Sequence, residues 1–218
     1  MRDVILSSVV LAAVGLSASS GLAQSFNIDF GNATPAPSLT YGAASGQTGF
    51  WDIYAGGFVG SLFNTSGAPT SVSINAIGPN FLGANPDPLT LGDDEALLDD
   101  GMGYPFADTY TILGLAAGRY QVYCYTWTFG VLTADVSVNL SPSQQIGGPW
   151  TGSFTPGMYS LHTVTIAPAQ PLIIQAGNVN GALGAITGVQ IVSVPTPGAA
   201  GLLAIAGIGA TGRRRRCA

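Results

Sequence analysis

The residues best suited to chemistry in this 218-residue chain are a run of acids near its middle. Segment 92–103 reads Gly-Asp-Asp-Glu-Ala-Leu-Leu-Asp-Asp-Gly-Met-Gly, and it holds five carboxylates. Their mutual repulsion would be relieved by a hard cation with oxygen ligands, for which calcium is the best match. The spacing is not that of an EF-hand loop, and a solvated acidic loop that aids solubility remains the alternative. The candidate calcium ligands are Asp93, Asp94, Glu95, Asp99 and Asp100.

Aromatic residues offer a second kind of site, on which sugar rings could stack. Loops at the edge of a β-domain usually carry its binding residues, so the aromatic residues expected there are the better candidates. We expect Trp51, Tyr54 and Trp150 to contact glycan, with a packed loop residue as the alternative for each. A stripe at alternate positions could also form a platform, although such stripes more often belong to a core. Its members are Tyr123, Tyr125, Trp127 and Phe129.

Residues for catalysis are scarce. His162 is the only histidine, and its place on the apolar face of an expected strand favours a core residue over a general base. No Gly-x-Ser-x-Gly motif is present. Cys124 lies within a strand pattern, which favours a buried inert thiol, and one His with one Cys makes a zinc site a poor prediction. We therefore expect a non-enzymatic protein; a secreted glycan-active hydrolase that uses two Asp residues is the weakest alternative.

Both ends of the chain carry targeting patterns. Arg2, an apolar stretch over 4–16 and small residues before Gln24 predict a secretory signal peptide over residues 1–23. At the other end, a proline motif precedes an uncharged run over 198–212 and a basic cluster. A helix over that run would be about 22 Å long, so it could span the ~30 Å hydrocarbon core only with local thinning or with arginines that reach the interface. The tail, residues 194–218, includes Val194, Pro195, Thr196, Pro197, Arg213, Arg214, Arg215 and Arg216.

This tail resembles the PEP-CTERM sorting signal of bacterial surface proteins. Thr196 stands where that family usually has Glu, and Cys217 and Ala218 follow the arginines. The resemblance implies transient anchoring in the inner membrane through the C-terminal helix. It also implies that an exosortase-like processing enzyme cuts near the proline motif and passes the protein to the cell surface or extracellular matrix. An uncleaved C-terminal anchor is the alternative.

The charge of the segment between the two ends excludes one class of partner. Residues 24–193 form a single expected domain with Arg119 as its only base against ten acids. Nucleic-acid binding needs a basic footprint, so no nucleic-acid partner is expected, and anionic lipid is disfavoured. Neutral sugars such as extracellular polysaccharide, cations and other surface proteins remain.

Short apolar-alternating segments separated by turns predict an all-β domain. They favour a two-sheet antiparallel β-sandwich, with a jelly roll first and an immunoglobulin-like sandwich as the alternative. Segments 114–123 and 186–191 resemble a turn and two strands of galactose-binding-like jelly-roll modules. Segment 78–88 is expected to be a loop, and 92–103 to contain one helical turn at most. The expected strands are 25–30, 50–54, 71–77, 108–113, 119–129, 134–140, 161–167, 172–176 and 186–194.

Together these patterns predict an exported, non-catalytic surface or matrix protein that binds glycan or another surface component. The alternative is a purely structural matrix protein without a small ligand, whose acidic loop meets calcium or neighbouring chains.

Overall fold

The structure is a computed structural model of the chain, and it describes residues 24–77, 81–84, 86–104, 107–126, 133–178 and 184–195. Fourteen strands and one α-helix lie in these ranges, which confirms the all-β class. None of the helices described is long and apolar enough to cross a bilayer. The expected signal peptide, the sorting tail from Thr196 onward, Trp127 and Phe129 lie outside the described residues.

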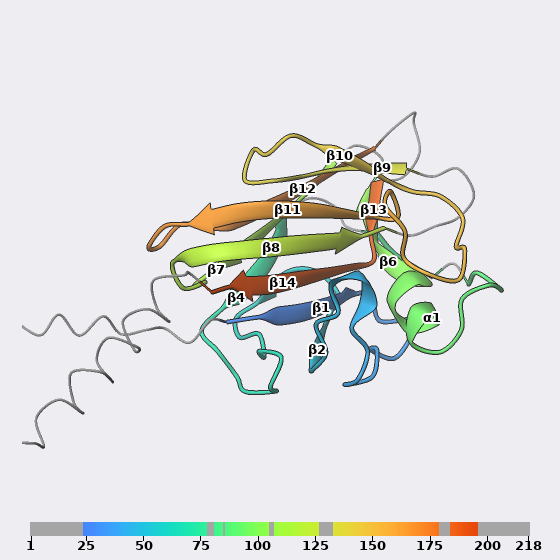
Figure 1. Cartoon of the computed structure of the whole chain (residues 1–218), viewed down its shortest axis with the longest axis horizontal. Helices are drawn as coiled ribbons and strands as arrows, with labels where there is room; N and C mark the ends of the chain where they lie inside the picture. Colours follow the sequence, from blue (N-terminus) through green and yellow to red (C-terminus); the bar gives the residue numbers. More distant parts are fainter. Residues whose placement is uncertain are drawn as a thin grey trace, which may run out of the picture.

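Two large sheets face each other and a small third sheet closes one end (Figure 1). The five-stranded sheet has the order β11 (Tyr159–Ile166), β8 (Gly118–Tyr125), β14 (Gly188–Val194), β1 (Phe26–Phe30) and β2 (Trp51–Tyr54). The six-stranded sheet has the order β10 (Gln144–Gly147), β9 (Thr133–Val138), β12 (Leu172–Asn178), β7 (Ala107–Leu113), β4 (Ser73–Ile77) and β3 (Phe58–Val59). The three-stranded sheet has the order β13 (Gly184–Ile186), β6 (Asp100–Tyr104) and β5 (Phe81–Ala84).

The path of the chain between the two large sheets fits the jelly-roll form of the prediction. From β7 onward the chain crosses from sheet to sheet, with β7, β9 and β12 in one and β8, β11 and β14 in the other. One pairing departs from the expected antiparallel arrangement, because β1 and β2 run parallel, with Asn27 opposite Trp51. Parallel neighbours need a crossover of a dozen or more residues, and the long connection 31–50 supplies it.

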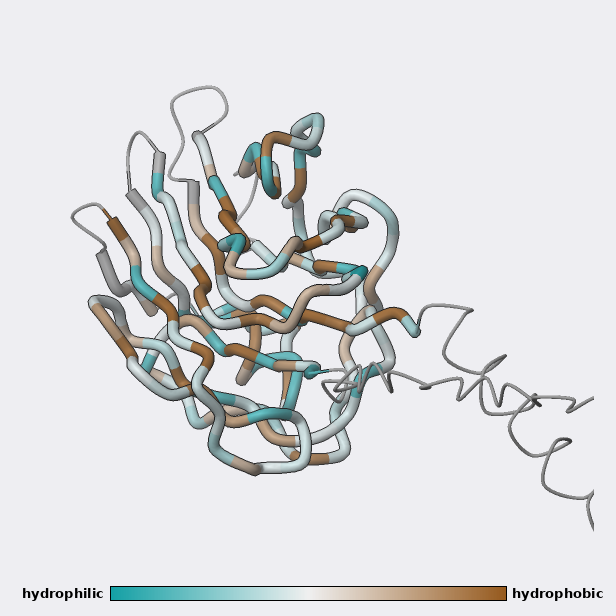
Figure 2. The backbone as a smooth tube through the Cα atoms, turned by 90° about the vertical axis from the view of Figure 1, so that its left-hand side faces the viewer, coloured by the Kyte–Doolittle hydropathy of each residue, from teal (hydrophilic) through white to brown (hydrophobic). Residues whose placement is uncertain are grey.

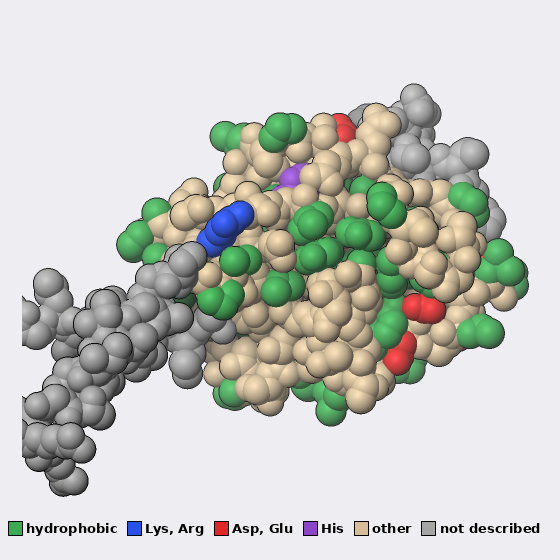
Figure 3. Space-filling view, viewed as in Figure 1, with side chains coloured by type: hydrophobic (Ala, Val, Ile, Leu, Met, Phe, Trp, Pro, Cys, Tyr) green, Lys and Arg blue, Asp and Glu red, His purple; other side chains and the backbone are tan. Residues whose placement is uncertain are grey.

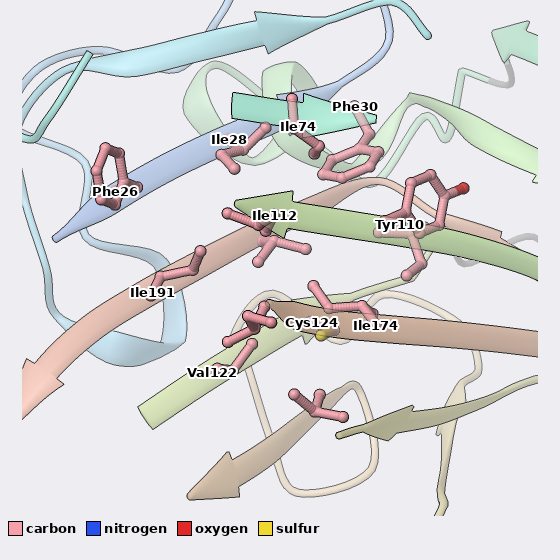
Figure 4. Close-up of a cluster of buried hydrophobic side chains, with 14 of the residues drawn as sticks. Phe26, Ile28, Phe30, Ile74, Tyr110, Ile112, Val122, Cys124, Ile174 and Ile191 are labelled. Carbon is pink, nitrogen blue, oxygen red and sulfur yellow. The ribbon is translucent and has the colours of Figure 1, made fainter. Parts of the chain in front are cut away.

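The main core lies between the two large sheets and follows from the strict alternation of the strands. Every second residue of β1 points into it, namely Phe26, Ile28 and Phe30, all of them fully buried. Figure 4 shows Ile28 and Phe30 beside Ile112 and Tyr110 of the opposite sheet, where Phe30 packs edge-to-face on Tyr110 at 4.9 Å. In Figure 2 the same alternation is visible as brown and teal stretches along the strands.

The prediction that Cys124 is buried is confirmed, and the residue lies in this core. It is fully buried, and burial raises the pKa of its thiol to about 12.

The sequence-based prediction is wrong in three local details. Segment 78–88 contains β5, and segment 92–103 contains β6 and a helix, α1 (Asp93–Leu98), longer than the single turn expected. Burial of Ala96, Leu97 and Leu98 stabilises this helix, because so short a helix is not stable without tertiary packing. The expected strand 134–140 ends at Val138, and Leu140 is 92% exposed because the chain turns at Asn139 with a positive φ at both residues.

Candidate functional site

A second apolar cluster lies on the outer face of the five-stranded sheet, the face turned away from the main core. Tyr125 is the sheet residue at its centre, because odd-numbered positions of β8 point outward while Val122 and Cys124 point inward. Loop segments around residues 36–44 and 150–158, together with α1, cover it. The buried members of this outer cluster are Trp51, Leu97, Leu98, Tyr125, Trp150 and Met158.

A buried amide network fixes the first of these loops to the sheet. Gln190 of β14 donates through Nε2 to Asn27 Oδ1 at 2.9 Å and to the carbonyl of Gln47 at 2.9 Å. Gln47 in turn donates to the same Asn27 oxygen at 2.8 Å. The Tyr125 hydroxyl donates to Gln190 Oε1 at 2.6 Å and accepts from the Ala44 amide at 3.1 Å. These bonds hold the 3₁₀ turn η1 (Ala43–Ser45) over the sheet.

A pocket of about 430 Å³ opens between this loop and the loop over 150–154. Trp150 and Phe154 form one wall, with ring centroids 5.0 Å apart in an edge-to-face arrangement. Tyr41 and Asp94 lie on the other side, and the Tyr41 hydroxyl donates to Asp94 Oδ1 at 2.5 Å. The pocket is lined by Tyr41, Gly42, Ala43, Ala44, Asp94, Trp150, Gly152, Ser153 and Phe154.

The electrostatics of the pocket favour hydrogen bonding over acid–base chemistry. Burial, followed by the Asp94 carboxylate, raises the pKa of Tyr41 far above its ordinary value, so the hydroxyl stays a proton donor. Within the described residues nothing else bonds the Asp94 carboxylate, which leaves Oδ2 to accept from a ligand. Partly exposed aromatic faces and one acceptor suit a neutral molecule with hydroxyl groups, and the volume falls in the range of small-ligand sites.

The three aromatic residues predicted as glycan contacts are buried, which matches the alternative that they are packed residues. Trp51 is 3% exposed, Tyr54 0% and Trp150 4%. Trp51 and Tyr54 are β2 residues; Tyr54 packs edge-to-face on Phe30 at 5.2 Å and donates to the carbonyl of Gly57. Of the three, only Trp150 lines the pocket, where its ring lies edge-to-face against Phe154.

The acids of segment 92–103 do not converge. Two of them fasten neighbouring loops from the two ends of α1. Asp93 accepts from the amide and the hydroxyl of Ser38 at 2.6 and 2.7 Å. Asp100 accepts through Oδ2 from the amides of Ala33 and Thr34 at 2.7 and 3.0 Å.

The other three acids of the segment point in further directions. Asp99 accepts from the Thr90 hydroxyl at 2.6 Å and from the Asp87 amide at 3.0 Å, Asp94 faces the pocket, and Glu95 is exposed. Across the part of the chain that the structure describes, no three His, Cys, Asp or Glu side chains gather into a group that could hold a metal ion.

His162 occupies the core position that its strand pattern predicts. It is 3% exposed, burial lowers its pKa, and its Nδ1 lies 2.8 Å from the Ser141 hydroxyl oxygen.

Two aromatic residues that line the pocket, Tyr41 and Phe154, were not predicted from the sequence. Both lie in glycine-rich segments without strand periodicity, and an aromatic residue beside glycines is the one signal that could have marked them.

No protein-family model matches the chain, and no curated protein matches it. Protein YxiM from Bacillus subtilis is a similar solved structure, at 12% identity and a TM-score of 0.49, covering 78% of this chain and 40% of that one. A calcium-binding mutant of Bacteroides uniformis beta-glucuronidase 2 has 13% identity and a TM-score of 0.47, with coverages of 81% and 18%. The ANXUR2 extracellular domain from Arabidopsis thaliana has 14% identity and a TM-score of 0.46, with coverages of 79% and 42%. The chain thus spans less than half the length of each of these proteins.

Proposed function

We propose that this chain is an exported, non-catalytic binding protein whose loop pocket takes a neutral sugar unit of a surface polysaccharide. The observation that carries the proposal is the pocket between the 41–44 and 150–154 loops, where an aromatic wall faces the Asp94 carboxylate, an acceptor that the Tyr41 hydroxyl holds in place. A sugar ring presents one apolar face for the wall and hydroxyl groups for the polar side.

The charge of the domain supports a neutral ligand over an anionic one. Arg119 is the only Lys or Arg among the described residues, and it lies on β8 opposite Val194, far along the strand from Tyr125. Figure 3 shows one blue patch near the left end of this face and most of the red at the right end. An acidic polysaccharide would meet no cationic side chain at the pocket.

A glycan array tests the binding proposal. The probe is residues 24–195, which contain both large sheets and their core, and the array includes exopolysaccharide from the source cells. Phe154→Ala removes the partly exposed ring of the aromatic wall and should weaken binding roughly tenfold, equivalent to about 1.4 kcal/mol. Phe58→Ala removes an equally large side chain that is 68% exposed on β3, outside the pocket, and should leave binding unchanged.

A blank array, or equal binding by both variants, would reject the pocket and favour the purely structural matrix protein.

Sorting to the surface is proposed from the two ends of the sequence. We expect an exosortase-like enzyme to process the tail after transient anchoring in the inner membrane. Replacing Pro195 and Pro197 by Ala should keep the chain in the membrane fraction, as followed by immunoblot. Mass spectrometry of the wild-type surface protein should find a C-terminus near residue 195; an intact Cys217–Ala218 end would contradict cleavage.

A further inference from the structure

Three buried oxygen atoms without hydrogen-bond partners belong to three segments that meet at one end of the five-stranded sheet. They are Asp29 Oδ1 on β1, Asp100 Oδ1 at the start of β6 and Thr187 Oγ1 between β13 and β14. Asp29 and Asp100 are each 1% exposed and Thr187 is fully buried. Nine buried side-chain polar atoms lack a partner among the described residues, and three oxygens of the nine lie in this one region, where a single ligand could satisfy them together.

The backbone brings these three residues together. Asp29 lies opposite Gly188 in the β1–β14 ladder, and the Phe30 amide donates to the Thr187 carbonyl at 2.8 Å. A Cβ on Gly31 would come within 2.3 Å of the Asp100 carboxyl carbon, so Asp100 lies directly on the end of β1. A Cβ on Gly101 would in turn lie 3.1 Å from a side-chain carbon of Thr187.

The surroundings leave the two carboxylates without a neutralising side chain. Burial, followed by the Asp100 charge, raises the pKa of Asp29 to about 9. The nearest described Lys or Arg by topology is Arg119, which lies six positions along β8 from Tyr125, the partner of Gly188. At about 3.4 Å per residue that separation is about 20 Å, too far for an ion pair.

There is also room beside Asp100. A cavity of about 60 Å³ adjoins this side chain and is lined by Gly31, Asn32, Ala33, Gly83, Ala84 and Asp100. One water occupies about 30 Å³, so this space is large enough for one or two waters beside Asp100, although Asp29 and Thr187 do not line it. Because Oδ2 of Asp100 is already held by the Ala33 and Thr34 amides, the orientation of its Oδ1 is fixed.

We propose that Asp29, Asp100 and Thr187 bind a divalent cation of the calcium class. Two carboxylate oxygens and a hydroxyl are hard ligands, and calcium completes an irregular shell of six to eight oxygens with water. A proton shared by the two carboxyl groups would leave the Thr187 oxygen without a partner, whereas a cation satisfies all three atoms. The site differs from the one predicted from sequence, since only Asp100 of the acidic segment belongs to it.

The cation would also stabilise the covering loops. Asp100 holds the backbone at Ala33 and Thr34, and the Thr34 hydroxyl donates to the Ala96 carbonyl of α1 at 3.0 Å. Helix α1 carries Asp94 to the pocket. If the proposed sugar binding is correct, we therefore expect it to weaken in chelator, and this consequence alone rests on the proposed function.

Calcium binding can be measured directly, without any glycan. The full chain is stripped with chelator and titrated with calcium chloride by calorimetry and by thermal unfolding. We expect one site per chain and a Tm increase of roughly 5–10 °C when calcium reaches about 100 times its Kd. An unchanged Tm at concentrations well above the ~1 mM Kd of weak extracellular sites would overturn the proposal.

Variants locate the site. Asp29→Asn should abolish binding, and Thr187→Val, which preserves shape, should weaken it roughly tenfold. Glu95→Gln removes one exposed carboxylate nearby and should bind calcium like the wild type. If Asp29→Asn fails to fold, the Thr187→Val variant and the wild-type titration still test the site. Calcium affinity that is lost in Glu95→Gln and kept in Thr187→Val would overturn the assignment.

Discussion

Replacing Tyr125 by Phe removes one oxygen atom from the centre of the outer cluster. This hydroxyl joins Gln190 Oε1, at 2.6 Å, to the Ala44 amide, at 3.1 Å, and the side chain is fully buried. Without it, both partners lose a hydrogen bond in a site that solvent does not reach easily. The net value of a hydrogen bond is about 1 kcal/mol, and a buried group left unpaired costs about 1–3 kcal/mol. We therefore expect the free energy of unfolding to fall by about 2–3 kcal/mol.

Urea unfolding followed by tryptophan fluorescence measures this loss. With a slope of about 2 kcal/mol per molar, typical of small domains, the midpoint should fall by about 1 M with the slope unchanged. Tyr120→Phe is the matched control on the same strand. Its hydroxyl donates to a single acceptor, the Ala116 carbonyl at 2.8 Å, so its loss should cost only about 1 kcal/mol. If Tyr125→Phe costs no more than Tyr120→Phe, the amide network does not fix the loop as argued.

Three further predictions concern the main core and one buried acid. Ile174→Ala leaves a cavity between the sheets and should lower the free energy of unfolding by about 2–5 kcal/mol, while Ile77→Ala, at a side chain 64% exposed, should change it little in the same urea titration. The Cys124 thiol, whose pKa burial raises to about 12, should react with a thiol reagent only after unfolding; rapid labelling of the native protein would contradict its burial. Burial raises the pKa of Asp52 to about 6, so the folded state binds this proton more tightly than the unfolded state does. The stabilisation from this bound proton is complete below about pH 4 and is lost as the pH rises through about 6. Relative to Asp52→Asn, the wild type should therefore lose free energy of unfolding between these two pH values. A difference in stability between the two proteins that does not change with pH would contradict this prediction.

The strands that could be predicted from the sequence are those in which every second side chain is buried. In β11, Ser160, His162, Val164 and Ile166 are buried and the residues between them are exposed or partly so, which a period of two describes completely. Strand β6 could not be found this way. Gly101 and Gly103 give it little strand propensity, and it forms because β5 and β13 pair with it on either side.

The pocket could not be predicted from the sequence, for a different reason. The two loops that line it, 41–44 and 150–154, are more than a hundred positions apart, and neither loop has a periodic pattern. Tyr41 reaches Asp94 only because the connection between β1 and β2 folds back over the sheet. The sequence predicted Trp51, Tyr54 and Trp150 as sugar contacts, but only Trp150 lines the pocket, and the same connection packs over Trp51. Exposure of an aromatic residue depends on what packs over it, which local sequence does not record.

The acids of segment 92–103 acquire a physical explanation from the loops that they hold. Asp93 begins α1 and Asp100 begins β6 shortly after the helix ends, and both accept hydrogen bonds from backbone amides of the segment 33–38. Charged acceptors make stronger bonds than neutral ones, so acids are well suited to fastening a loop that lacks strand partners. That role accounts for one oxygen of Asp100 and leaves the other buried beside Asp29. The charge density that suggested a calcium-binding loop therefore serves mainly to attach loops, and the cation that we propose would bind where one of these acids meets a second carboxylate from β1.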